Sequence, residues 1–149
     1  MSMWACSIQT DVSLSAATAK TVYGLKAPTG AIIELHEIHV DFESVTAADG
    51  PALIEIVRGA ADGTGTPETP VNLKGGHTAT ASFTAASNYT VEPISLTVVR
   101  EYQYPVQGSV DIPLAGLGSV VESAVAGFLG VRITTPQAQS CRVSTLVRA

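Results

Sequence analysis

Hydrophobic residues in this chain recur at every second position in short runs, and the pattern contains no long amphipathic helix. The runs are rich in Val, Ile and Thr and are bounded by Gly, Pro, Ser or Asp, which is typical of β-strands joined by turns. We expect eight or nine strands, and the segments that carry them are 19–27, 31–43, 51–59, 77–86, 94–104, 105–113, 115–127, 127–135 and 140–149. The segment 115–127 is compatible with either a short strand or a turn of helix. Because no crossover helix separates the runs, the strands should pair antiparallel.

Eight strands in a chain of 149 residues fit an all-β, antiparallel two-sheet sandwich, and the jelly roll is its eight-stranded form. An immunoglobulin-type sandwich is the alternative. Such domains are usually about 100 residues long and often carry a Cys–Trp–Cys pattern, which this chain lacks. We therefore predict a jelly-roll domain over residues 19–149 and an extended N-terminal arm over residues 1–18.

The strand predicted over residues 31–43 changes phase in its middle. Its aliphatic residues alternate in one phase before position 36 and in the other phase after it: Ile33, Leu35, then Ile38, Val40 and Phe42. A bulge or bend near His36 and Glu37 would produce this change, and we expect it to let one strand serve both sheets.

Two segments are expected to contact a partner. The stretch 60–76 is rich in Gly and Pro, so we expect a long surface loop without a β-ladder, with contacts made by Thr64, Thr66 and Pro67. The arm has too little apolar area to fold alone, so we expect it to become ordered on a neighbouring subunit. Its contact residues would be its bulky apolar ones: Trp4, Ile8, Val12 and Leu14.

The histidines give no clear sign of a metal or catalytic site. His36 and His39 are three positions apart, so on a regular strand they lie on opposite faces and cannot share a metal. Glu37, His39 and Asp41 share a face and could bind a divalent ion or respond to pH. Alternating polar residues on the outer face of a half-buried strand are the more ordinary interpretation.

The remaining motifs also point away from catalysis. Two cysteines are too few for a disulfide framework or a four-ligand zinc site, and Cys141 lies in an alternating strand that would bury its free thiol. Ser119 lacks the second glycine of a nucleophile elbow, and the Gly-rich stretch after residue 60 has neither phosphate-loop nor EF-hand spacing. We predict no catalytic, cofactor-binding or metal-binding residue and no small-molecule substrate.

Composition favours assembly with other chains. Hydrophobic residues make up 46% of the sequence and charged residues 14%, well below the ~25% of ordinary globular proteins. A core of this size cannot absorb so much apolar area, so we expect an oligomer. The net charge is −5 and the 8 basic residues are scattered, which argues against nucleic-acid binding. No apolar run is long enough to span a membrane, and the N-terminus does not have the pattern of a secretory signal.

Three stretches in order resemble the small jelly-roll decoration (cement) proteins of tailed-bacteriophage capsids. They are "VDFESVTAADGPALIEIVRG", "ADGTGTPETPVNLKG" and "PVQGSVDIPLAGLGSVVESAVAGFLGVRITTP", the last with a G-x-R-x-T-x-P pattern at Gly130, Arg132, Thr134 and Pro136. The resemblance covers residues 19–148 and leaves the arm outside. It implies a virion protein, made in the cytoplasm of the bacterial host, that binds the major capsid protein on the capsid exterior as a homotrimer without catalysis.

Two other functions stay open. A jelly-roll carbohydrate- or receptor-binding module of a phage tail or head fibre would need exposed aromatic residues in a cleft, and aromatic residues are 5% of this chain. An enzyme of the cupin type would need two or three inward-facing histidines with a carboxylate, which the predicted strands do not supply.

Overall fold

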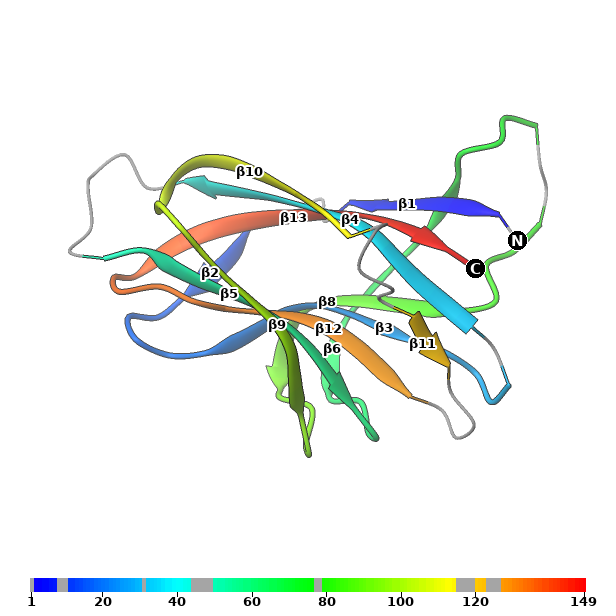
Figure 1. Cartoon of the computed structure of the whole chain (residues 1–149), viewed down its shortest axis with the longest axis horizontal. Coiled ribbons are helices and arrows are strands. Elements are labelled where there is room, and N and C mark those ends of the chain that lie inside the picture. The colour runs from blue at the N-terminus through cyan, green and yellow to red at the C-terminus, as the bar shows by residue number, and fades with distance from the viewer. Residues whose placement is uncertain are drawn as a thin grey trace.

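A computed structural model describes residues 2–7, 11–30, 32–43, 50–76, 79–114, 120–122 and 127–149. These residues form two antiparallel β-sheets packed face to face, without a helix (Figure 1). The predicted all-β, two-sheet sandwich is confirmed. The described part of the chain accordingly offers no helix of the length and hydropathy needed to cross a bilayer.

The first sheet has seven strands, five of them in the order β10-β4-β13-β1-β7. The other two, β11 and β2, extend the edges of β4 and β13 beyond β10 and β1. The bounds of the seven strands are β1 (Met3–Ser7), β2 (Val12–Leu14), β4 (Ile32–Glu43), β7 (Val71–Asn72), β10 (Gln107–Pro113), β11 (Val120–Glu122) and β13 (Gln139–Arg148).

The second sheet has six strands in the order β6-β8-β3-β12-β5-β9. Their bounds are β3 (Lys20–Lys26), β5 (Ala52–Gly59), β6 (Thr64–Glu68), β8 (Thr84–Val91), β9 (Thr97–Tyr104) and β12 (Phe128–Thr134). At each side of the sandwich an edge strand of this sheet leads, through a two-residue connection containing a proline, into an edge strand of the first sheet. Pro70 lies between β6 and β7, and Pro105 lies between β9 and β10.

The main core lies between the two sheets. Alternate residues of the central strands supply it, and its largest fully buried members are Tyr23, Leu25, Ile33, Leu35, Ile38, Ile54, Ile56, Ile112, Leu114 and Ile133. A separate small cluster joins Val57, Tyr89 and Phe128. Because Leu129 belongs to the main core and side chains alternate along a strand, Phe128 lies on the opposite, outer face of the six-stranded sheet.

The phase change in the predicted strand 31–43 is a β-bulge at the expected place. In the register between β4 and β13, Leu146 is opposite Glu37 and Val147 is opposite Leu35, so His36 is the extra residue. Its carbonyl accepts a hydrogen bond from the Leu114 backbone N–H at 2.7 Å. The bulge brings the aliphatic residues before it and after it onto the same face of β4, because all of them are buried in the same core. The expectation that the strand serves both sheets is therefore wrong.

The segment expected to be an N-terminal arm is part of the first sheet. β1 pairs with the end of β13 from Ser144 to Arg148, and β2 pairs with its beginning from Gln139 to Cys141. The ten residues of β13 are long enough to hold both short strands along one edge. The predicted boundary at residue 18 thus separates segments that share a sheet and a core.

The stretch 60–76 was expected to contain no ladder, and this expectation is also wrong. β6 pairs with β8, and β7 pairs with β1. Both are outermost strands, so Pro67 can sit in β6 with no N–H directed to a neighbour on the free side. A register irregularity between Thr64 and Thr66 marks the Gly-rich part of the strand.

The strand predicted over 77–86 begins later than the alternation suggested. It runs from Thr84 to Val91 and passes through the stretch expected to be a turn, with Asn88 in the left-handed region at φ 48°. Asn tolerates this conformation better than most residues because its short side chain can bond locally. The strands predicted around residues 19–27, 31–43, 51–59, 94–104, 105–113, 127–135 and 140–149 are confirmed.

Candidate functional site

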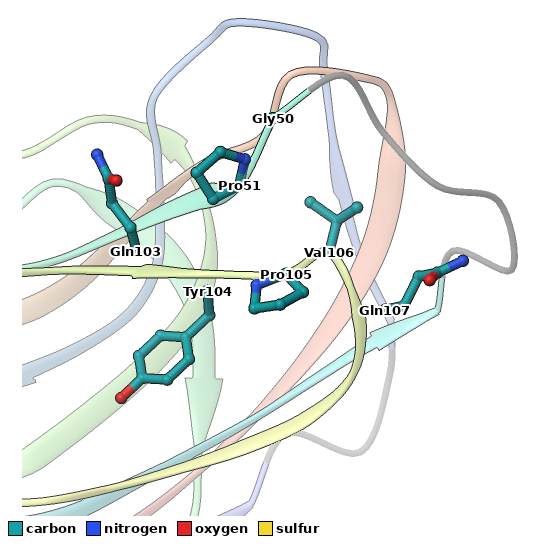
Figure 2. Close-up of a pocket in the computed structure, with 7 residues that line it drawn as sticks. All are labelled: Gly50, Pro51, Gln103, Tyr104, Pro105, Val106 and Gln107. Atoms are coloured by element: carbon teal, nitrogen blue, oxygen red, sulfur yellow. The ribbon is translucent and has the colours of Figure 1, made fainter.

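A hollow of about 410 Å³ lies where β9 leads into β10. It is lined by Gly50, Pro51 and the run from Gln103 to Gln107. Figure 2 shows the rings of Pro51 and Pro105 and the side chain of Val106 near one another, with Gln103 and Gln107 extending to either side. None of these lining residues is charged. The hollow therefore supplies an apolar surface with amide groups at its rim, which suits contact with a protein or a neutral ligand.

A second hollow, of about 490 Å³, lies at the opposite side where β6 leads into β7. Trp4 and Phe83 form part of its wall, with ring centroids 6.2 Å apart in an edge-to-face arrangement. Its one lining carboxylate is Glu68, which accepts a hydrogen bond from the Ser87 hydroxyl. The lining residues do not include a nucleophile beside a general base.

The most concentrated group of titratable residues lies on the outer face of the seven-stranded sheet. His39 contacts two carboxylates at once: Nδ1 bonds with Asp111 on β10, and Nε2 lies 2.9 Å from Asp41 Oδ1. The Ser109 hydroxyl also donates to Asp41. Glu37, His39 and Asp41 are all half-buried on this face, as their spacing predicted.

The bulge changes the position of His36. Because His36 is the extra residue, it joins His39 among the half-buried polar residues of β4, and the expectation that the two lie on opposite faces is wrong. They nevertheless have separate partners: His36 Nε2 lies 2.9 Å from Glu34 Oε2, while His39 bonds with aspartates. Among the described residues, no group of three or more His, Cys, Asp or Glu side chains is arranged to hold a metal ion.

The carboxylates around His39 change its proton affinity. The hydrogen bond that the ring donates to Asp111, followed by the contact with Asp41, raises the pKa of His39 above 6.5 despite partial burial, which acts in the opposite direction. The pKa of Asp41 is lowered, first by the Ser109 hydroxyl and then by His39. Both shifts favour an ion pair between the two strands.

A buried ion pair lies on the outer face of the six-stranded sheet. Glu55 on β5 is 5% exposed and accepts two hydrogen bonds from Arg132 on β12, each at 3.0 Å. Sequence reasoning assigned no role to either residue. The two residues are directly opposite each other because β5 pairs with β12, a pairing that a single sequence does not reveal.

The predicted contact residues divide into three classes. Trp4, Val12 and Leu14 are 5%, 0% and 3% exposed in the chain's own core, so the expectation that they bind a neighbour is wrong. Thr64, Thr66 and Pro67 are exposed on β6 and remain available to a partner. Ile8 lies outside the described residues, and so does Ser119.

Exposed aliphatic side chains occur instead at both sides of the sandwich. Val71 and Leu73, at and just beyond β7, are 62% and 54% exposed, and we call them the β7 group. Ile94, Val98 and Val99, at or just before β9, are 66%, 37% and 47% exposed and form the β9 group. Alternation in this segment does not show whether its apolar face is buried, because it cannot reveal that β9 is an edge strand.

Both cysteines are free and buried. Burial raises the pKa of Cys141 to about 12 and also raises that of Cys6, so neither thiol is a ready nucleophile at neutral pH. The prediction of a buried free thiol at Cys141 is confirmed.

No protein-family model, curated protein or solved structure matches this chain.

Proposed function

We propose that this chain is a virion structural protein that decorates the exterior of a tailed-bacteriophage capsid as a homotrimer bound to the major capsid protein. The resemblance of residues 19–148 to decoration proteins supports the proposal of capsid decoration. The observation that carries assembly is the position of the exposed aliphatic residues, because the β7 and β9 groups lie at opposite sides of the sandwich.

Two separate apolar groups suit a subunit that contacts more than one neighbour. One side can meet another copy of the chain while the other meets the shell. Burial of an exposed aliphatic side chain contributes roughly 1.5–3 kcal/mol, so a few such residues per interface matter to binding. The exposed Thr64, Thr66 and Pro67 lie next to the β7 group and extend that side.

The test combines sedimentation equilibrium of the purified protein with its occupancy on virions. We expect a trimer at micromolar concentration and stoichiometric occupancy. Two paired variants, Val71→Asp with Leu73→Asp and Ile94→Asp with Val98→Asp, should each lose either self-association or occupancy. Thr80→Asp is the matched control, because Thr80 is exposed and belongs to neither group. A monomer that is absent from purified virions would contradict the proposal.

A fibre module that binds a glycan or receptor is the second candidate. The hollow between β9 and β10 favours it, because its lining includes Tyr104, Gln103 and Gln107, and an aromatic ring with amide groups suits a neutral sugar. Glycan-array binding that Tyr104→Ala abolishes would favour this function over capsid decoration.

A further inference from the structure

Two side-chain bonds tie the edge strand β10 to β4: His39 bonds with Asp111, and the Ser109 hydroxyl donates to Asp41. Asp111 is the residue directly opposite His39 in the register of β10 with β4, and Ser109 is opposite Asp41. In the described sheet β10 pairs with β4 and with no other strand. Side-chain contacts across this ladder therefore add to the backbone hydrogen bonds with β4 in holding the strand.

The hydrogen-bond donors of the imidazole ring decide which protonation state of His39 fits this arrangement. A neutral histidine has one N–H donor and one nitrogen lone pair, whereas the imidazolium has two donors. Both ring nitrogens of His39 face carboxylate oxygens, which accept hydrogen bonds and cannot donate them when ionised. Only the protonated ring satisfies Asp111 and Asp41 together. Loss of the proton leaves a lone pair directed at a carboxylate.

The other charged groups around His39 determine which bond would be lost. On β4, Asp41 has Ser109 as a second donor, and Glu37 lies two positions before His39 on the same face. On β13, the residue opposite His39 is the uncharged Ser144, and Arg142 opposite Asp41 is paired with Asp11 and Glu43. Asp111 has a side chain that is 66% exposed, so water can readily replace its bond to the ring.

We propose that His39 is a proton-operated latch on β10: the protonated ring clamps Asp111 and Asp41 together, and the neutral ring releases Asp111. The stabilisation is present in full below pH 6.5, the ordinary pKa of histidine, and is lost as the pH rises through the higher pKa of the folded protein. At acid pH the bond from the ring to Asp41 is lost only when Asp41 is protonated, and the pKa of Asp41 is lowered by the Ser109 hydroxyl and by His39. Edge strand β10 is therefore held most firmly in mildly acidic solution.

The latch can be tested by nuclear magnetic resonance on the intact chain. The Cε1–H signal of His39, assigned by its loss in His39→Gln, should titrate with a midpoint above 6.5, and Asp111→Asn should move that midpoint downward. Each unit by which the midpoint exceeds 6.5 multiplies the folding equilibrium constant about tenfold at low pH. Hydrogen exchange of the β10 amides, corrected for the intrinsic effect of pH, should accelerate as the pH rises through the same midpoint. The corrected exchange rates of the β12 amides, in the centre of the other sheet, should not change as the pH passes this midpoint.

His36→Gln is the matched control, because His36 faces a carboxylate through one ring nitrogen and does not contact β10 through its side chain. This variant should keep the pH dependence of β10 exchange, and His39→Gln should abolish it. A His39 midpoint at or below 6.5, or β10 exchange that does not change across the titration, would overturn the proposal. The pH dependence of β10 exchange is measured on the wild-type chain, so this part of the test stands even if a variant fails to fold.

Discussion

At the scale of single residues, two aromatic rings lie over glycines of the six-stranded sheet. Tyr89 and Phe128 pack edge to face with centroids 5.9 Å apart, and both cover Gly24. A Cβ atom at Gly24 would lie 2.2 Å from Tyr89 Oη and 2.4 Å from Phe128 Cε2. The absence of a side chain at this position makes room for the small outer cluster.

Gly24→Ala should therefore destabilise the fold. Both rings would have to move, and overpacking of a tight site costs about 1–3 kcal/mol. The measurement is the free energy of unfolding in urea. Gly75→Ala is the control, since a Cβ there has no atom within 4 Å, and it should change stability by less than about 0.5 kcal/mol. Equal stability of the two variants would show that the rings adapt freely.

Removal of Arg132 should be more costly. Arg132→Leu leaves the Glu55 carboxylate buried without its two bonds, a loss that typically costs about 3–5 kcal/mol. The double variant Glu55→Leu with Arg132→Leu should recover most of this loss. Arg142→Leu breaks an exposed pair with Asp11, which water screens, and should cost far less than Arg132→Leu. If the double variant is as unstable as Arg132→Leu alone, the penalty does not come from an unpaired charge.

At the scale of elements, the N-terminal strands belong to the core. Deletion of residues 1–14 removes β1 and β2 together with the buried Trp4, Cys6, Val12 and Leu14. We expect the remainder to lose its native circular dichroism spectrum, since Trp→Ala alone costs about 3–5 kcal/mol in a core. Trp4→Phe, which keeps an aromatic ring against Phe83, should retain the fold. A truncated protein with a native spectrum and cooperative unfolding would contradict this role.

The segment between β5 and β8 is also structural. Replacement of residues 64–72 by a short Gly-Ser linker removes β6 and β7 from the two sheet edges. We expect the melting temperature to fall by at least about 10 °C, because each kcal/mol corresponds to about 2–4 °C in a chain of this size. Shortening the exposed turn 74–76 is the control and should change it by no more than about 2 °C. If the linker variant and the parent protein have similar melting temperatures, the segment is a dispensable loop.

The elements also show how far a single sequence can predict this fold. Alternation revealed most of the strands, and the phase change located the bulge at His36, because both are local properties. Pairing is not local. The sequence therefore could not show that the strand containing Trp4 pairs with β13. For the same reason it could not show that Pro67 lies in an edge strand or that Glu55 is hydrogen-bonded to Arg132. The His39 group was recognised in part: its row on β4 was visible, but Asp111 lies 72 positions away and comes close only through the pairing of β10.

At the scale of the whole molecule, the two ends of the chain are paired with each other. The Ser2 N–H donates to the Ala149 carbonyl at 2.7 Å, and the Ala149 N–H donates to the Ser2 carbonyl at 3.0 Å. Figure 1 shows both termini at the same end of the sandwich. Residues 2 and 149 are therefore close enough to be joined by a short linker.

A circular permutant should consequently fold. Joining the ends by a short flexible linker and opening the chain at Gly75 cuts an exposed turn and leaves every described strand whole. We expect its free energy of unfolding to stay within about 2 kcal/mol of the parent value, by urea denaturation. A permutant opened within β13 provides the contrast and should not fold. Failure of the Gly75 permutant would show that the turn contributes more than its exposure suggests.

The pairing of β1 with β13 has a consequence for biosynthesis. β1 leaves the ribosome before β13 and must wait for it before it can enter the sheet. At about 5–20 residues per second, synthesis of these 149 residues takes roughly 7–30 s. Until β13 has been made, Trp4 lacks the neighbouring strand beside which its ring is buried. Nascent chains of this protein should therefore remain open to proteases and chaperones until β13 has emerged from the ribosome, and the sandwich should close only then.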